Sequence, residues 1–187
     1  MKKKAVAQIG FEFLSVVFAV LLALGLNSYK QGLDFENESD LLRERIITEV
    51  IANKARLDSV IIRNENTMDY LDSLSTLESF GGFAFEVADD LVLQSAWTFT
   101  QSSKAFSYMD PEFLTQAAQV YEVQSYYRDA NDQSLVYLGD IMLKVSELEE
   151  HDLLNACQFY LMNLLEVSHE LQDNYRDFLD TFAPDQS

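Results

Sequence analysis

The sequence LLNACQFYLMNLLEVSHELQDNYRDFLDTF, residues 153–182, places apolar side chains alternately three and four residues apart. This spacing puts them along one face of an α-helix, as a seam that packs against another helix. Pro184 follows and predicts the end of the helix, because proline lacks the N–H group that a continuing helix would use. The seam consists of Leu154, Cys157, Leu161, Leu164, Ser168, Leu171, Tyr175, Phe178 and Phe182.

A second seam of the same kind covers residues 46–74 and predicts another long helix. Asn53 and Asn64 stand at two of its inward positions. A buried Asn between chains fixes register or oligomer state, whereas a buried Asn inside one domain hydrogen-bonds within the core. Both interpretations stay open on the sequence. The apolar positions of this seam are Ile46, Val50, Leu57, Val60, Leu71 and Leu74.

The residues between the two seams predict shorter helices. Gly81 and Gly82 are expected to end the first long helix, because glycine is a strong breaker of helical patterns. A second helix is expected over Val87–Phe106, with an inward face formed by Leu91, Ala96 and Trp97.

A third helix begins at MDPEF, residues 109–113. Asp110 is a favourable N-cap residue, and Pro111 has the backbone geometry of a first helical position. The helix is expected to run to about Arg128, where the turn-forming run DANDQS interrupts it before a helical pattern resumes over Leu135–Val145. The sequence therefore predicts an all-α fold, an antiparallel helical bundle with long first and last helices.

The 22 residues from Ala5 to Leu26 are long and apolar enough to cross a bilayer as a helix. Three lysines precede this run and acidic residues follow it, so the positive-inside bias places the N-terminus in the cytoplasm. A cleaved secretory signal is the alternative; Glu12 and the bulky residues around Ala23 and Gly25 argue against it. Both interpretations export the domain that follows.

Glu12, Ser15, Ala19 and Ala23 fall on one face of this membrane helix, within an arc of about 80°. Small residues four apart let a second helix approach closely, and a carboxyl group in lipid is tolerated where it faces protein or reaches the interface. This face is a candidate contact surface. For Glu12 the alternative is that its side chain extends to the lipid headgroups near the cytoplasmic end of the helix.

The same helix carries the pattern Glu12, Val16, Val17, Ala19, Leu21, Ala23, Leu24, Asn27 and Tyr29. This pattern resembles the N-terminal helix of a family of uncharacterised bacterial single-pass membrane proteins. The resemblance extends through LLRERIITEVIANKARLDSVI, residues 41–61, and covers about the first third of the chain. That family usually has tryptophan at the position of Tyr29 and glycine at that of Ala19. The resemblance implies a bacterial inner-membrane protein with a periplasmic C-terminal domain. It implies nothing about an activity, because that family has none assigned.

The chain after the apolar run is strongly acidic. Of the 13 basic and 31 acidic residues in the whole chain, all but Lys2 to Lys4 and Glu12 lie in it. About 10 basic and about 30 acidic residues therefore leave about 20 net negative charges. Such a surface repels nucleic acid and anionic headgroups, so no nucleic-acid partner is expected. The acids alternate with apolar and aromatic residues, which is typical of the solvated face of a folded domain.

No motif in the sequence specifies a reaction. Cys157 has no second cysteine to pair with, and its seam position predicts a buried thiol. Glu166 and His169 have the Glu-x-x-His spacing of carboxylate di-metal bundles, but the second pair that such a site needs is missing. We therefore predict no enzyme activity, no metal and no cofactor. Aromatic residues either pack in the core or line a ligand pocket, with Trp97, Tyr108 and Tyr121 as candidates.

These observations divide the chain into a cytoplasmic tip and membrane helix (1–29), a linker (30–38), an exported acidic bundle (39–184) and a tail (185–187). We expect an interaction subunit. Its partners would be the lipid bilayer and other membrane protein chains, in a homo- or hetero-oligomer. The alternative is a membrane-anchored helical domain that senses or binds a small apolar or aromatic ligand.

Overall fold

The computed structural model gives the backbone of residues 2–88, 92–143 and 149–183, and the side chains from Leu14 onward within these ranges except that of Met142. Every regular element in these ranges is helical, which confirms the all-α class. The elements are α1 (Lys2–Ser75), α2 (Ser95–Ser102), the 3₁₀ helix η1 (Lys104–Tyr108), α3 (Pro111–Met142) and α4 (Glu150–Phe182).

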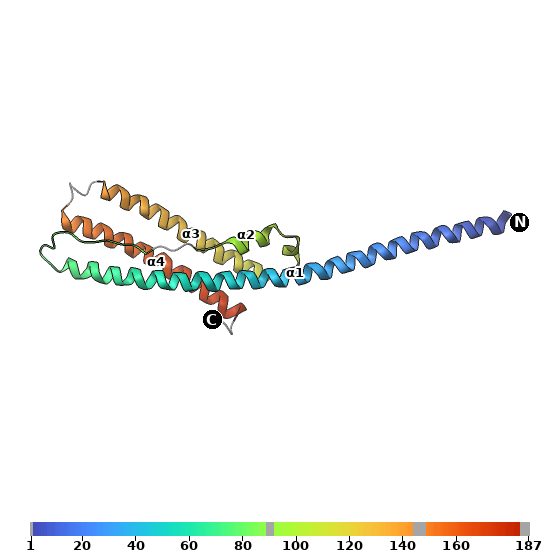
Figure 1. Ribbon diagram of the computed structural model, residues 1–187, viewed down its shortest axis with the longest axis horizontal. Coiled ribbons are helices and arrows are strands. Elements are labelled where there is room, and N and C mark those ends of the chain that lie inside the picture. The colour runs from blue at the N-terminus through green and yellow to red at the C-terminus, as the bar shows by residue number, and fades with distance from the viewer. Residues whose placement is uncertain (1, 89–91, 144–148, 184–187) are drawn as a thin grey trace.

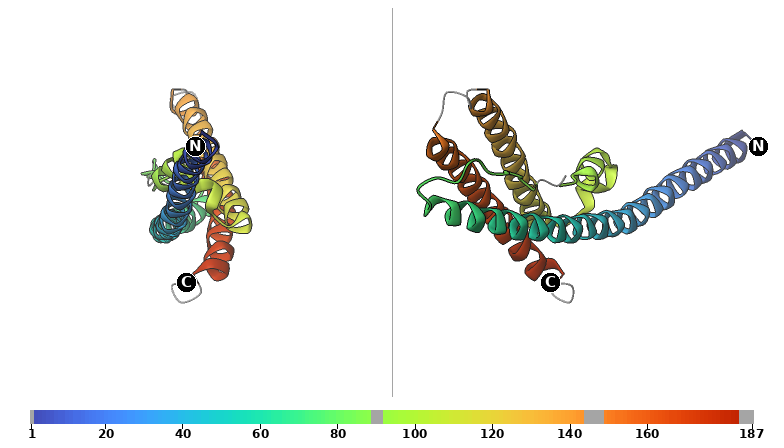
Figure 2. Two further views of the ribbon diagram at one scale, coloured as in Figure 1. Left: turned by 90° about the vertical axis from the view of Figure 1, so that its right-hand side faces the viewer. Right: turned by 60° about the vertical axis from the view of Figure 1, so that its left-hand side comes forward.

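The long helices form an antiparallel bundle (Figure 1). α1 leads away from the N-terminus, an extended segment and α2 return beside it, α3 runs outward again and α4 returns. α4 packs against both α1 and α3. In Figure 1 and in the right view of Figure 2, the N-terminal part of α1 continues past the bundle with no other element beside it. The predicted antiparallel arrangement with long first and last helices is confirmed.

The core follows the two predicted seams. In α4 every seam position from Leu154 to Phe178 is buried, and Phe182 packs at its edge. In α1 the seam positions Ile46 and Val50 are fully buried, as are Asn53 and Asn64. Apolar area removed from water stabilises a fold by about 25 cal/mol per Å², so burial of these two seams stabilises the bundle.

The expected linker over residues 30–38 is part of α1, so the chain is unbroken between the apolar run and the bundle. Gly32 lowers helix propensity by only about 1 kcal/mol relative to Ala, and the residues around it are good helix formers. Phe35 adds a tertiary contact, because its ring packs 5.3 Å from that of Tyr108. The apolar run and the first bundle helix are therefore one rod.

The prediction of a helix over Val87–Phe106 is wrong for most of its length. Helix α2 covers only Ser95–Ser102, and the described residues before it are extended. Gly81 and Gly82 have positive φ angles of 65° and 98°, which turn the chain sharply after α1. Beyond this turn, aromatic side chains pack against the core from an extended backbone rather than from a helix. Leu91 lies outside the described residues.

The third helix is longer than expected. Asp110 caps α3 as predicted, accepting a hydrogen bond from the Phe113 N–H group (2.8 Å). The run DANDQS does not interrupt it, because α3 is continuous from Pro111 to Met142. Asn131 is buried within that run and accepts a hydrogen bond from the Tyr160 hydroxyl of α4 (3.4 Å). Packing on α4 thus outweighs the low helix propensity of these residues.

The continuity of α1 can be tested with spin labels at Tyr29 and Glu44. Fifteen residues of helix separate the labelled backbone positions by about 22 Å, so the full-length chain should give one narrow distance distribution by electron paramagnetic resonance. Gly32→Pro should broaden and shorten the distribution, because proline disrupts a helix interior. Gly32→Ala is the matched control and should leave it narrow. A broad distribution in the unsubstituted chain would contradict a continuous rod.

Candidate functional site

Two buried asparagines of α1 bind the extended segment as a neighbouring strand would. The Asn53 side-chain amide donates to the Leu93 carbonyl oxygen (2.7 Å), and the Leu93 N–H group donates to Asn53 Oδ1 (2.8 Å). Asn64 makes the same pair of bonds with Ala88, at 3.1 Å from its amide and 2.9 Å to its Oδ1. A carboxamide has the same donor and acceptor as a peptide group, so each asparagine satisfies one residue of extended backbone.

The order of these two contacts gives the direction of the segment. Asn53 and Asn64 are eleven residues apart in α1, which is about 16 Å at 1.5 Å per residue. Asn53, the earlier asparagine, binds Leu93, the later residue of the segment, and Asn64 binds Ala88. The extended segment therefore lies antiparallel to α1 over this stretch. The asparagines serve the domain's own core, which is one of the two interpretations that the sequence left open.

A buried polar cluster joins every layer of the bundle at Leu93. Gln124 of α3 donates from its amide to the Leu93 carbonyl oxygen (2.8 Å). The Gln124 side-chain oxygen accepts from Asn53 of α1 (3.2 Å) and from the Tyr175 hydroxyl of α4 (2.7 Å). Asn53, Gln124 and Tyr175 are fully buried. Because each has hydrogen-bond partners, the cluster avoids the penalty of an unsatisfied polar group in the core.

Glu49, one turn before Asn53, extends this cluster to α2. Its carboxylate accepts from the Ser95 hydroxyl (2.6 Å), the Ala96 N–H group (2.9 Å) and the Tyr121 hydroxyl (2.7 Å). The negative charge thus lies at the N-terminus of α2, where exposed N–H groups and the helix dipole favour it. Glu49 is nearly buried, and its three donors replace the water it has lost.

Burial keeps two phenols of this cluster and the Cys157 thiol protonated near neutral pH. Burial is the main cause that raises the pKa of Tyr121 and of Tyr175 well above the ordinary range, so both phenols stay protonated. Burial likewise raises the pKa of Cys157 to about 11, which leaves its sulfur as an unreactive thiol near neutral pH.

The three aromatic candidates for a ligand pocket do not converge. Trp97 stacks on Tyr121, with ring centroids 5.4 Å apart and planes 8° from parallel. Tyr108 packs on Phe35 instead. A surface hollow of about 950 Å³ lies beside Trp97 and includes Phe106, but neither Tyr108 nor Tyr121 lines it. The three residues therefore do not line one pocket, and the binding of a small apolar ligand stays a prediction.

The predicted contact face of the apolar stretch, which consists of Glu12, Ser15, Ala19 and Ala23, lies on the part of α1 beyond the bundle. Ser15, Ala19 and Ala23 are exposed there. The side chain of Glu12 lies outside the described residues. The apolar stretch of α1 is long enough to cross a membrane, and none of its described residues is buried. These positions stay a predicted contact face.

The Glu-x-x-His pair is divided between two contacts. His169 lies 3.4 Å from a carboxylate oxygen of Glu65 on α1, and Glu166 lines a groove between α3 and α4. Within the described part of the chain, no three His, Cys, Asp or Glu side chains come together as a metal site would require.

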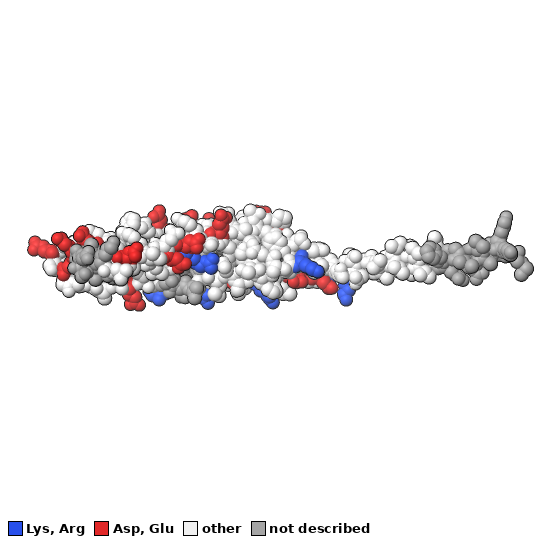
Figure 3. Space-filling view, turned by 90° about the horizontal axis from the view of Figure 1, so that it is seen from above, with Lys and Arg blue, Asp and Glu red and all other residues white. Residues whose placement is uncertain are grey.

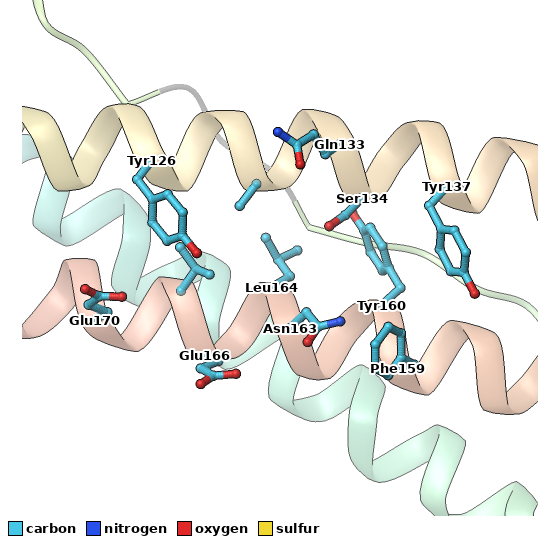
Figure 4. Close-up of a pocket in the computed structure, with 12 residues that line it drawn as sticks. Tyr126, Gln133, Ser134, Tyr137, Phe159, Tyr160, Asn163, Leu164, Glu166 and Glu170 are labelled. Atoms are coloured by element: carbon cyan, nitrogen blue, oxygen red, sulfur yellow. The ribbon is translucent and has the colours of Figure 1, made fainter.

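The groove between α3 and α4 was not found from the sequence. Figure 4 shows Tyr126 and Tyr137 of α3 facing α4, with Phe159, Glu166 and Glu170 along the opposite wall. The spacing of its tyrosines in the sequence is a weak indication of this groove. Tyr126 and Tyr137 are eleven residues apart, three helical turns, so they share a face of α3 without belonging to the buried seam.

The exposed charge is uneven. In Figure 3 acidic side chains gather over the end of the bundle farthest from the N-terminus, and the described apolar stretch of α1 carries none. Comparison with known proteins adds no assignment, because no family model, curated protein or solved structure matches this chain.

The asparagine contacts predict a local and measurable loss of stability. Asn53→Ala and Asn64→Ala should each lower the free energy of unfolding by about 1 to 3 kcal/mol, because a buried backbone group loses its partner. Denaturant unfolding of the full chain, followed by circular dichroism, measures this. Asn155→Ala on the exposed face of α4 is the control and should change stability by no more than about 0.5 kcal/mol. Equal effects at all three positions would contradict the assignment.

The two buried phenols predict a loss of stability at alkaline pH. Their pKa values are raised in the folded chain, so above pH 10 the unfolded chain releases protons that the folded chain retains. Stability is therefore complete below about pH 10 and falls above it, by up to about 1.4 kcal/mol per pH unit for each phenol. Urea midpoints from pH 8 to 11 measure the slope. The Tyr121→Phe, Tyr175→Phe double variant should have a shallower slope, and an unchanged slope would refute this origin.

Proposed function

We propose that this chain is a single-pass subunit of the bacterial inner membrane whose membrane helix and exported bundle bind partner protein chains. The oligomer is either homomeric or heteromeric, with the N-terminus in the cytoplasm and the C-terminal domain in the periplasm. The observation that carries the proposal is the continuity of α1. One helix supplies both the apolar stretch and the seam of the bundle, so a contact made in the membrane orients the whole domain.

The apolar stretch supports a membrane location. From Leu14 to Leu26 its large apolar side chains are 39 to 68% exposed, and no other element of the described chain covers them. A surface of this size is unusual on a soluble monomer, whereas its length suits the hydrocarbon core of a bilayer. Lys2 to Lys4 favour a cytoplasmic N-terminus.

The contact face in the membrane continues onto the bundle. Ala23 and Leu41 are eighteen residues apart, which is five full helical turns, so they lie on the same side of α1. Leu41, Arg45 and Thr48 form one wall of a mainly apolar groove between α1 and α2. Phe99 of α2 forms part of the other wall and packs 5.7 Å from the Arg45 guanidinium. A partner helix packed on Ala19 and Ala23 could follow α1 into this groove.

The charge of the exported domain favours protein partners over the lipid surface. Its acidic residues repel anionic headgroups, so the bundle is expected to stand away from the membrane on its α1 rod. The sides of the bundle are then accessible to other chains. This geometry suits a subunit that presents a helical domain at a fixed height.

The membrane contact predicts different effects for neighbouring substitutions. Ala19→Leu should reduce association, because a bulky side chain separates two closely packed backbones, whereas Val20→Leu on the flank is the matched control. If Glu12 packs against a partner through hydrogen bonds, Glu12→Gln should be mild and Glu12→Leu damaging, by about 0.6 to 2 kcal/mol. Cysteine crosslinking in native membranes measures association.

The other outcomes are equally informative. Loss of association with both Glu12 variants would indicate a cationic partner, and no effect of either would indicate a side chain at the headgroups. The intact mass of the membrane-bound chain shows whether the helix is retained. Indifference to both Ala19→Leu and Glu12→Leu, or a strictly monomeric chain in native membranes, would refute the proposed contact.

A further inference from the structure

A groove of about 470 Å³ lies between α3 and α4 (Figure 4). Three aromatic side chains line it and remain about half exposed: Tyr126 (57%), Tyr137 (49%) and Phe159 (54%). The volume is in the range of sites that hold small organic molecules, about 300 to 1,000 Å³. An open aromatic hollow of this size is a candidate binding site.

The charged side chains that line the groove are all negative. Glu166 and Glu170 stand on α4 toward the Tyr126 end, and Tyr137 and Phe159 lie toward the other end. None of the lining residues is Lys, Arg or His. In the part of the chain that the structure describes, neither carboxylate makes an ion pair. The groove therefore has an aromatic end and an anionic end.

We propose that this groove binds a small amphipathic organic cation, with an apolar or aromatic body between Tyr137 and Phe159 and an ammonium group beside Glu166, Glu170 and the ring of Tyr126. An aromatic ring face attracts a cation, and carboxylates add charge-assisted hydrogen bonds. The Asn163 and Gln133 side chains line the middle of the groove and can accept or donate further hydrogen bonds.

The dimensions of the groove select the shape of the ligand. Phe159 and Glu166 are seven residues apart on α4, about 10 Å along the helix axis, so body and ammonium need a spacer between them. A compact ion such as tetramethylammonium would reach only one end. The acidic surface of the whole domain raises the local concentration of any cation, which assists capture. The inference is independent of the proposed membrane contact, because no residue of α1 lines the groove.

Three probes with the same phenyl ring and matched chain length separate charge recognition from apolar binding: 4-phenylbutylammonium, 4-phenylbutan-1-ol and 4-phenylbutyrate. We expect the cation to bind the full-length chain about tenfold or more tightly than the alcohol, and the carboxylate not to bind. Isothermal titration calorimetry in nanodiscs of zwitterionic lipid measures this, with empty nanodiscs as the blank. Equal binding of all three probes, or no saturable binding of the cation, would overturn the proposal.

Substitutions then place the binding in this groove. The Glu166→Gln, Glu170→Gln double variant should weaken the cation about fivefold or more and leave the alcohol unchanged. Tyr126→Leu should also weaken the cation severalfold through loss of the ring face. Asp132→Asn with Asp180→Asn removes the same charge at exposed positions that do not line the groove, and should have little effect. If this control weakened binding as much as the glutamate pair, the site would be excluded.

Discussion

The backbone N–H and carbonyl groups of Leu93 are the point on which the bundle depends. Leu93 belongs to an extended segment, and the described part of the chain offers no neighbouring strand to pair with these two groups. Buried backbone groups of this kind are almost always hydrogen-bonded, because leaving one unpaired costs about as much as a lost hydrogen bond. Asn53 and Gln124 supply the missing partners from two different helices. Tyr175 then fixes Gln124 from a third helix.

This arrangement contributes more to specificity than to raw stability. A fully satisfied buried network adds little net free energy, but any other register of the helices would leave several of its groups unpaired. Glu49 strengthens the constraint, because its carboxylate positions the start of α2 and accepts from Tyr121 of α3. Apolar packing alone would allow α1 to slide by a turn along its partners. The asparagines allow only one position.

The sequence predicts the parts of this fold that depend on period and fails where a distant partner decides. The seams of α1 and α4 repeat regularly, and both helices are found as expected. The segment between them has apolar residues without a strict period, and its extended form depends on Asn53 and Asn64, whose partners lie 40 and 24 residues away. The seam pattern shows that both asparagines stand at inward positions, but it does not show which residues they bind. The groove between α3 and α4 depends on the same kind of distant contact, since two helices must meet before its aromatic wall exists.

The position of the asparagines also determines how the two ends of the molecule are linked. Both stand on α1, the helix that continues without a break into the apolar stretch. A rotation of this helix about its axis would withdraw Asn53 from Leu93 and Asn64 from Ala88 together, so the bundle resists it with four hydrogen bonds at once. Rotation or tilt imposed on the apolar stretch is therefore transmitted to the bundle as movement of the whole body, not absorbed inside it. In the function that we propose, the bundle would therefore report the orientation of the apolar stretch directly.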